Sequence, residues 1–176
     1  MQISTDIYEH IKITAIDTLE YYNIKSLPIN AFEMAYKIGL TIIPYSSFGK
    51  SAELLKKYSE DGFLVDKTIY YNDQCRNFGR INNTIMHEVG HYVLGHVSNG
   101  ETEEKEANFF AKYTLAPPPL IHKLIKEPTI NGVADLFDIS YTVAHNAIDY
   151  YYKWQNYGER NYTTYEQKLL RLFDVA

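Results

Sequence analysis

The stretch NTIMHEVGHYVLGH, residues 83–96, carries two histidines four positions apart, with a glutamate directly after the first. Side chains at positions i and i+4 of a helix project from the same face, so His87 and His91 can each offer an imidazole nitrogen to one zinc ion. Glu88 lies one position further round the helix, where its carboxylate reaches a water on the metal without pointing at the metal. In this arrangement zinc lowers the pKa of the water to about 7, and the glutamate accepts the proton as the water attacks a carbonyl group. The three residues therefore predict a catalytic zinc site.

The surroundings of the motif support this interpretation. A pattern of three fixed residues also arises by chance, but here it lies among Ile85, Val89 and Val93 on an apolar helix. Ionisable groups are costly to bury in such a place unless something such as a metal satisfies them.

A catalytic zinc ion needs a third protein ligand and one open position. His96 is the nearest further histidine, but the extended pattern H-E-x-x-H-x-x-G-x-x-H requires glycine at position 94 and histidine at position 97. The chain has Leu94 and Val97 there. We therefore interpret His96 as a polar residue at the end of the helix and not as a ligand.

A carboxylate from the next predicted helix is the better candidate for the third ligand. Four residues of EEKEANFFA share one helix face because they follow each other at positions i, i+3, i+4 and i+7: Glu104, Ala107, Asn108 and Ala111. The two alanines allow this helix to approach the motif helix closely, so that Glu104 points at the zinc and Asn108 can hydrogen-bond a ligating histidine. Glu106 is the alternative ligand and is less favoured than Glu104 because it lies on another face of the helix. Glu103 and Glu106 are expected to belong to a solvated acidic first turn.

Hydrophobic periodicity and turn residues predict the elements that position these side chains. Strands are expected over about 40–43, 63–66 and 68–72, the last two as a hairpin, which gives a small antiparallel sheet of about three strands. The segment GKSAELLKKYSEDG, residues 49–62, is interpreted as a polar connection. Helices are predicted over residues 3–22, 31–38, 82–95, 101–116, 120–126, 132–137, 141–154 and 165–173.

Length and composition limit the class of protein. The chain has 176 residues, of which 45% are hydrophobic and 22% charged, as in ordinary soluble globular proteins. We predict one α+β domain over residues 1–176 in which helices dominate, with a core over 1–119 and a helical C-terminal subdomain over 120–176.

Charge and targeting signals indicate the cellular setting. A net charge of −5 argues against nucleic-acid binding, which requires a dense basic patch. No apolar run approaches the roughly 20 residues that span a bilayer, and the N-terminus has no signal-peptide pattern. The single Cys75 cannot form an intramolecular disulfide. We therefore expect a cytoplasmic protein.

Five segments together resemble the ImmA/IrrE family of gluzincin-type zinc metallo-endopeptidases. They are PINAFEMAYKIGLTI, IYYND, TIMHEVGHYVLGH, EKEANFFAKYTLAPPPL and VADLFDISYTVAHNAI, which occur in the order of the family over residues 28–148. The resemblance implies that His87 and His91 are zinc ligands, that Glu88 is the general base and that Glu104 is the third ligand.

The same resemblance implies a biological role. Family members are cytoplasmic proteases of prophages, mobile elements or stress-response loci, and they cleave a transcriptional repressor of the helix-turn-helix class. The chain departs from its relatives at Asn82 and Asn83, where a basic and an aromatic residue are common.

Residues at about 130–150 resemble a short helix-turn-helix unit with DIS, residues 138–140, as the turn. The second helix of this unit carries only Lys153 as a cation, beside Asp149, and a recognition helix without arginine has little means of reading guanine. We interpret the unit as a packing element or as a surface that docks the protein substrate.

Two alternative functions stay open from the sequence. The chain could be a non-catalytic zinc-binding regulator that acts by binding another protein, or a DNA-binding protein that uses its C-terminal helices, which the charge disfavours. The group that stabilises the oxyanion is also open, with Arg80 and Tyr113 as candidates.

Overall fold

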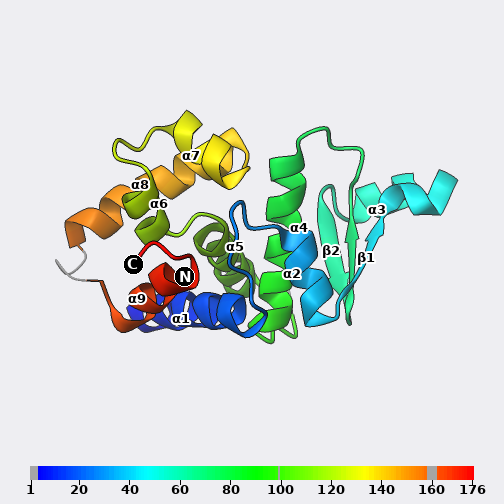
Figure 1. Cartoon of the computed structure of the whole chain (residues 1–176). Helices are drawn as coiled ribbons and strands as arrows, with labels where there is room; N and C mark the ends of the chain where they lie inside the picture. The colour runs from blue at the N-terminus through cyan, green and yellow to red at the C-terminus, as the bar shows by residue number, and fades with distance from the viewer. Residues whose placement is uncertain (1–3, 99, 158–161) are drawn as a thin grey trace.

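The structure is a computed structural model that describes residues 4–98, 100–157 and 162–176. Two long helices, α4 (Phe78–Val93) and α5 (Glu101–Leu115), pack against each other at the centre of the molecule. In Figure 1, α4 lies between the sheet on one side and α5 with the C-terminal helices on the other. The predicted α+β class with dominant helices is confirmed.

The other helices surround this central pair. They are α1 (Thr5–Tyr21), α2 (Ala31–Ile38), the 3-10 segment η1 (Tyr45–Ser51), α3 (Ala52–Tyr58), α6 (Pro118–Leu124), α7 (Ile130–Phe137), α8 (Tyr141–Tyr157) and α9 (Thr164–Leu172). The predicted helices are confirmed with small shifts at their ends, the largest at α4, which begins at Phe78 because the Asn77 side chain caps it by accepting from the Arg80 amide at 3.0 Å.

The sheet has three strands in the order β1-β3-β2: β1 (Thr41–Pro44), β2 (Gly62–Val65) and β3 (Thr68–Tyr71). The predicted hairpin is confirmed, with Gly62 opposite Tyr71 in an antiparallel register. The expectation of a wholly antiparallel sheet is wrong, because β1 pairs with β3 in parallel and the sheet is mixed.

The parallel pair follows from the path of the chain between β1 and β3. Residues 45–67 form this connection: η1 and α3 lead from β1 to β2, and β2 returns antiparallel, so that β3 runs parallel to β1. The polar segment over residues 49–62, for which no helix was predicted, contains the end of η1 and the whole of α3. The segment has few hydrophobic residues, so its sequence shows no apolar periodicity that would predict a helix.

The apolar side of α4 lies in the hydrophobic core. Ile85, Met86 and Val89 are fully buried and belong to the same cluster as Phe110 and Ala111 of α5. On its other flank α4 contacts α2, β2 and β3. The motif helix is thus fixed on both sides.

The C-terminal helices are joined to the first helix of the chain. Helix α9 packs on α1, where Lys168 pairs with Asp17 at 2.9 Å and the Tyr165 hydroxyl donates to Glu9 at 2.5 Å. Helices α7 and α8 pack on each other across a turn at Asp138, whose φ of 47° is left-handed. No helix in the described parts of the chain is both long and apolar enough to cross a membrane.

Asn82 joins α4 to the beginning of α2. Its side chain is 1% exposed, its Oδ1 accepts from the Ala31 amide at 2.7 Å, and its Nδ2 donates to the Ile29 carbonyl at 3.0 Å. A buried amide with both ends bonded to backbone fixes the two segments in register.

We predict that Asn82→Ala lowers the free energy of unfolding by about 2–3 kcal/mol, because it leaves one buried N–H and one buried C=O without partners. Urea denaturation measures the loss. Asn156→Ala, at an exposed position of α8, serves as the control and should change stability by less than about 0.5 kcal/mol. Equal losses in the two variants would contradict this role of Asn82.

Candidate metal centre

Helix α4 turns both motif histidines toward the same point. The Nε2 atoms of His87 and His91 lie 3.0 Å apart, with their rings at 76° to each other. Two imidazole nitrogens at adjacent turns of one helix face can bind a single ion.

Helix α5 brings a carboxylate to the same point. One oxygen of Glu104 lies 3.3 Å from Nε2 of His87, and the other lies 3.3 Å from Nε2 of His91. Ligand atoms of all three residues lie within 4.8 Å of one another, which makes them a group that could hold a metal ion.

Small residues allow the two helices to approach closely. A Cβ atom added at Gly90 of α4 would lie 3.0 Å from Cδ1 of Phe110 and 3.3 Å from Cα of Ala107. Ala107 and Ala111 of α5 are buried in the contact, as their positions on the predicted face of α5 indicated. The short distance between the helices is what puts the Glu104 side chain within reach of the histidines.

The electrostatics of the cluster suit metal binding. Burial lowers the pKa of both His87 and His91 to about 4, because desolvation disfavours the imidazolium form. The rings are therefore neutral at physiological pH, and neutral imidazole is the form that donates a lone pair to a metal. Two imidazoles and one carboxylate form a donor set used by catalytic zinc, so the residues fit such an ion.

Glu88 is held beside the cluster by the sheet. Its side chain is 7% exposed, and the backbone N–H of Leu64 in β2 donates to its carboxylate. Burial, followed by repulsion from Glu104, raises the pKa of Glu88 to about 7, against the smaller opposing effect of the Leu64 hydrogen bond. A carboxyl group with such a pKa can both accept and return a proton near neutral pH.

A cleft of about 430 Å³ opens over these groups. Its floor consists of His87, Glu88, His91 and Glu104. Its walls come from three parts of the chain: α4 (Asn83, Thr84), the segment from the end of α3 into β2 (Tyr58, Ser59, Asp61, Gly62, Phe63) and α5 (Asn108). The rings of Tyr58 and Phe63 meet edge to face, with centroids 4.8 Å apart, so one wall is aromatic.

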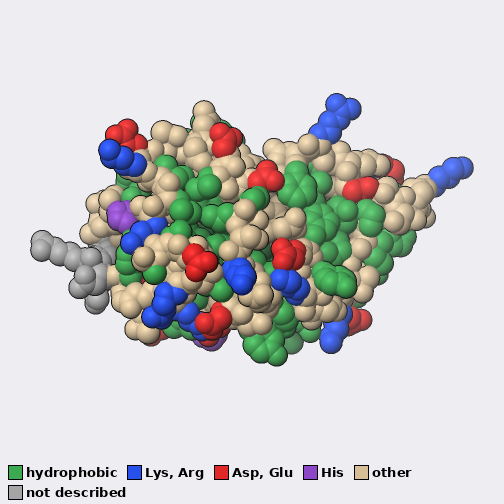
Figure 2. Space-filling view, viewed as in Figure 1, with side chains coloured by type: hydrophobic (Ala, Val, Ile, Leu, Met, Phe, Trp, Pro, Cys, Tyr) green, Lys and Arg blue, Asp and Glu red, His purple; other side chains and the backbone are tan. Residues whose placement is uncertain are grey.

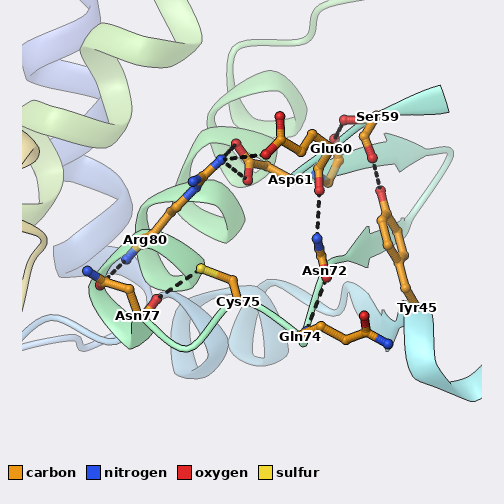
Figure 3. A network of polar contacts seen from close by, with 10 residues as sticks. Tyr45, Ser59, Glu60, Asp61, Asn72, Gln74, Cys75, Asn77 and Arg80 are labelled. Carbon is orange, nitrogen blue, oxygen red and sulfur yellow. Dashed lines mark hydrogen bonds and ion pairs between the residues drawn. The ribbon is translucent and has the colours of Figure 1, made fainter. Parts of the chain in front are cut away.

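The wall formed by the turn between α3 and β2 is held by polar contacts, which Figure 3 shows. Arg80 of α4 pairs with Asp61 at 2.7 Å and with Glu60 at 3.4 Å. The amide of Asn72 donates to the Glu60 carbonyl at 2.9 Å, and the Tyr45 hydroxyl donates to the Ser59 carbonyl at 3.1 Å. Three separate segments thus fix this turn at the rim of the cleft.

Two candidates for the oxyanion-stabilising group lie elsewhere. Arg80 is engaged with the turn residues Glu60 and Asp61. Tyr113 is 2% exposed in the core, and its hydroxyl has no hydrogen-bond partner in the described residues. Neither residue lines the cleft.

The structure also places the polar residues near the motif. Asn108 lines the cleft, but its amide donates to the Glu104 carbonyl at 2.8 Å, and no hydrogen bond to His87 or His91 is present among the described residues. His96 follows the end of α4, as predicted, and its two ring nitrogens also make contacts that the sequence did not predict, with His91 at 3.0 Å and Glu106 at 3.1 Å. Glu106 is accordingly half-buried and paired, which corrects the expectation that it belongs to a solvated acidic turn.

Comparisons with known proteins support the peptidase resemblance. The model of peptidase family M78, described as the IrrE N-terminal-like domain, matches residues 35–149. No curated protein and no solved structure matches the chain.

The raised pKa of Glu88 predicts how the metal-free protein responds to pH. Between about pH 4.5 and 7 the folded chain holds a proton on Glu88 that the unfolded chain has lost, so stability falls as the pH rises through this window. Glu88→Gln removes this loss and keeps an acceptor for Leu64. We expect the stability gain of the variant to be near zero at pH 4.5 and to reach at most about 3 kcal/mol above pH 7, at about 1.4 kcal/mol per pKa unit.

Urea unfolding of both proteins after treatment with a chelator, from pH 4.5 to 8, measures this difference. The pH dependence is the decisive quantity, because any constant packing effect of the substitution cancels from it. A difference in stability that stays flat over this range would contradict the raised pKa.

Proposed function

Because the chain belongs to the peptidase family that carries the IrrE N-terminal-like domain, a family of metallopeptidases, we propose that it is a zinc-dependent endopeptidase whose substrate is a helix-turn-helix transcriptional repressor. One observation carries the proposal: His87, His91 and Glu104 converge at one point, with Glu88 beside them in a cleft.

In this proposal His87, His91 and Glu104 hold the metal. Zinc is favoured over other ions by the donor set of two neutral imidazoles and one carboxylate. The metal supplies a Lewis acid that polarises the scissile carbonyl and acidifies the attacking water. The remaining chemistry belongs to the side chains of the chain.

Glu88 is the proposed general base. Its carboxylate takes the proton of the attacking water and then donates it to the leaving amine, so that the group ends the cycle as it began. A pKa near 7 suits both transfers, since the acid and the base form are then populated together.

The substrate class rests on the family resemblance and on the surface of the chain. In Figure 2, Lys and Arg side chains are scattered among acidic and hydrophobic ones on the visible face. Together with the net charge of −5, this argues against direct nucleic-acid binding and in favour of a protein partner. We propose a cytoplasmic role in prophage, mobile-element or stress regulation, in which cleavage of the repressor releases its target genes.

The proposed division of the chain follows from these roles. Residues 1–119 form the zincin-like core with the catalytic groups, and residues 120–176 form the helical subdomain. Its helix-turn-helix-like unit, at about 130–150, serves to pack against the core or to dock the substrate. Helix α8 has few positively charged residues, since Lys153 is the only Lys or Arg between Tyr141 and Tyr157. This favours docking of a protein over reading of DNA.

Glu88→Gln tests the catalytic role. The variant keeps all three metal ligands, so we expect one zinc ion per chain by elemental analysis and a loss of cleavage of at least about 100-fold, because general-base catalysis contributes roughly 10²–10⁴-fold. A small helix-turn-helix repressor encoded by a neighbouring gene, where the genome has one, is the assay substrate; it is incubated with the zinc-loaded enzyme and analysed by mass spectrometry.

Glu127→Gln, an exposed residue after α6, is the matched control and should cleave like the parent protein. A chelator should stop cleavage by the parent and added zinc should restore it. Undiminished cleavage by Glu88→Gln would remove the proposed mechanism. Full biological activity of a non-cleaving Glu88→Gln variant would instead favour the alternative, a zinc-binding regulator that acts by binding alone.

A further inference from the structure

His96 is folded back against the metal centre by the turn that ends α4. Gly95 has a left-handed φ of 72°, and the His96 amide donates to the His91 carbonyl at 3.0 Å. This turn leaves Val97 fully exposed, while the side chain of His96 is only 7% exposed. Apolar side chains are usually buried and polar ones exposed, but here the histidine is buried and the valine is exposed. The ring of His96 must therefore be held by specific contacts.

Those contacts form a chain of three residues. Nδ1 of His96 lies 3.0 Å from Nδ1 of His91, and Nε2 of His96 lies 3.1 Å from Oε2 of Glu106 on α5. The side chains of His91 and Glu106 are 6% and 18% exposed, so the chain is largely shielded from water. Both ring nitrogens of His96 are therefore engaged by protein groups.

The hydrogen bonds leave only one arrangement of protons that is compatible with a metal on His91. A metal bound through Nε2 of His91 requires the proton of that ring on Nδ1, which then donates to His96. His96 accepts through Nδ1, so its own proton is on Nε2, from which it donates to the Glu106 carboxylate. Every donor in this arrangement meets an acceptor.

The other motif histidine has no such support. Nδ1 of His87 is buried and has no hydrogen-bond partner among the described residues. The two ligands are thus unequal, and the ring whose orientation is fixed by the protein is that of His91.

We propose that His96 and Glu106 are positioning residues that act in series to orient His91 and strengthen it as a metal ligand. Helix α5 then holds His91 from two sides, by Glu104 at Nε2 and by Glu106 through His96 at Nδ1. A carboxylate at the end of such a chain increases the electron density of the ligating ring and fixes its tautomer. This inference rests on the proposed metal site.

Zinc affinity, measured by competition with a chromogenic chelator, tests the proposal without any need for a substrate. We expect His96→Ala and Glu106→Ala each to weaken zinc binding by about 10- to 100-fold, the usual effect of removing a hydrogen-bonding partner of a ligand. Glu106→Gln should lose less, because its amide oxygen can still accept from His96. Glu101→Ala removes the same charge from the first turn of α5, where Glu101 pairs with Lys105, and should bind zinc like the parent.

The double variant His96→Ala/Glu106→Ala decides whether the two residues act in series. If Glu106 acts only through His96, the double variant binds zinc no more weakly than His96→Ala. Losses that multiply in the double variant, or a zinc affinity of folded His96→Ala equal to that of the parent, would overturn the proposal. Circular dichroism of the metal-free variants shows whether they are folded.

Nitrogen-15 NMR of the histidine rings in the zinc-loaded parent protein provides a second test. This test does not depend on whether the variants fold. The proposal requires the proton on Nδ1 of His91 and on Nε2 of His96. A proton on Nδ1 of His96 would overturn it. If the parent protein binds no zinc, the proposed function fails as well, whereas normal zinc binding by His96→Ala rejects the positioning role alone.

Discussion

The close contact of α4 with α5 at Gly90 is the constraint on which the site depends. With no side chain at Gly90, the backbone of α4 comes within van der Waals distance of Ala107 and Phe110. At that separation Glu104 of α5 reaches the histidines of α4, which it could not do across an ordinary helix pair with large side chains at the contact. The same small residues therefore determine both the packing and the chemistry, because the short distance between α4 and α5 that they allow also brings the cluster together.

Burial gives this cluster its chemical character. Desolvation keeps the two motif histidines neutral and moves the pKa of Glu88 toward 7, so that ligands and base are each in the form their proposed roles need. The same convergence has an energetic cost in the tautomer that a metal requires, because the Nε2 lone pairs of both imidazoles then face one another and the oxygens of Glu104. A cation at their centre offsets this repulsion, which links metal binding to the stability of the α4 and α5 pair.

The sequence predicts most of the elements and the central cluster because both depend on local patterns. Gly39, which directly follows the helix predicted over residues 31–38, ends α2 in the left-handed conformation. The two alanines on the face of Glu104 correctly indicated a close helix contact. The helices in residues 45–58 were missed because their hydrophobic positions are sparse, and the parallel pairing of β1 was missed with them. The contacts of His96 could not be predicted from residue spacing, because its position depends on the left-handed turn at Gly95, which no spacing rule describes.

Helix α5 connects the metal centre with the rest of the chain. Glu104 and Glu106 are two positions apart and face different sides of α5, yet both end at His91, one directly and one through His96. The helix also packs on α1 and α8, and α1 in turn holds α9. A displacement of α5 would therefore alter Glu104, a proposed ligand, together with the contacts that support His91, a second proposed ligand. Because rigid positioning of ligands depends on the groups behind them, the N-terminal and C-terminal helices contribute to the geometry of the centre without touching it.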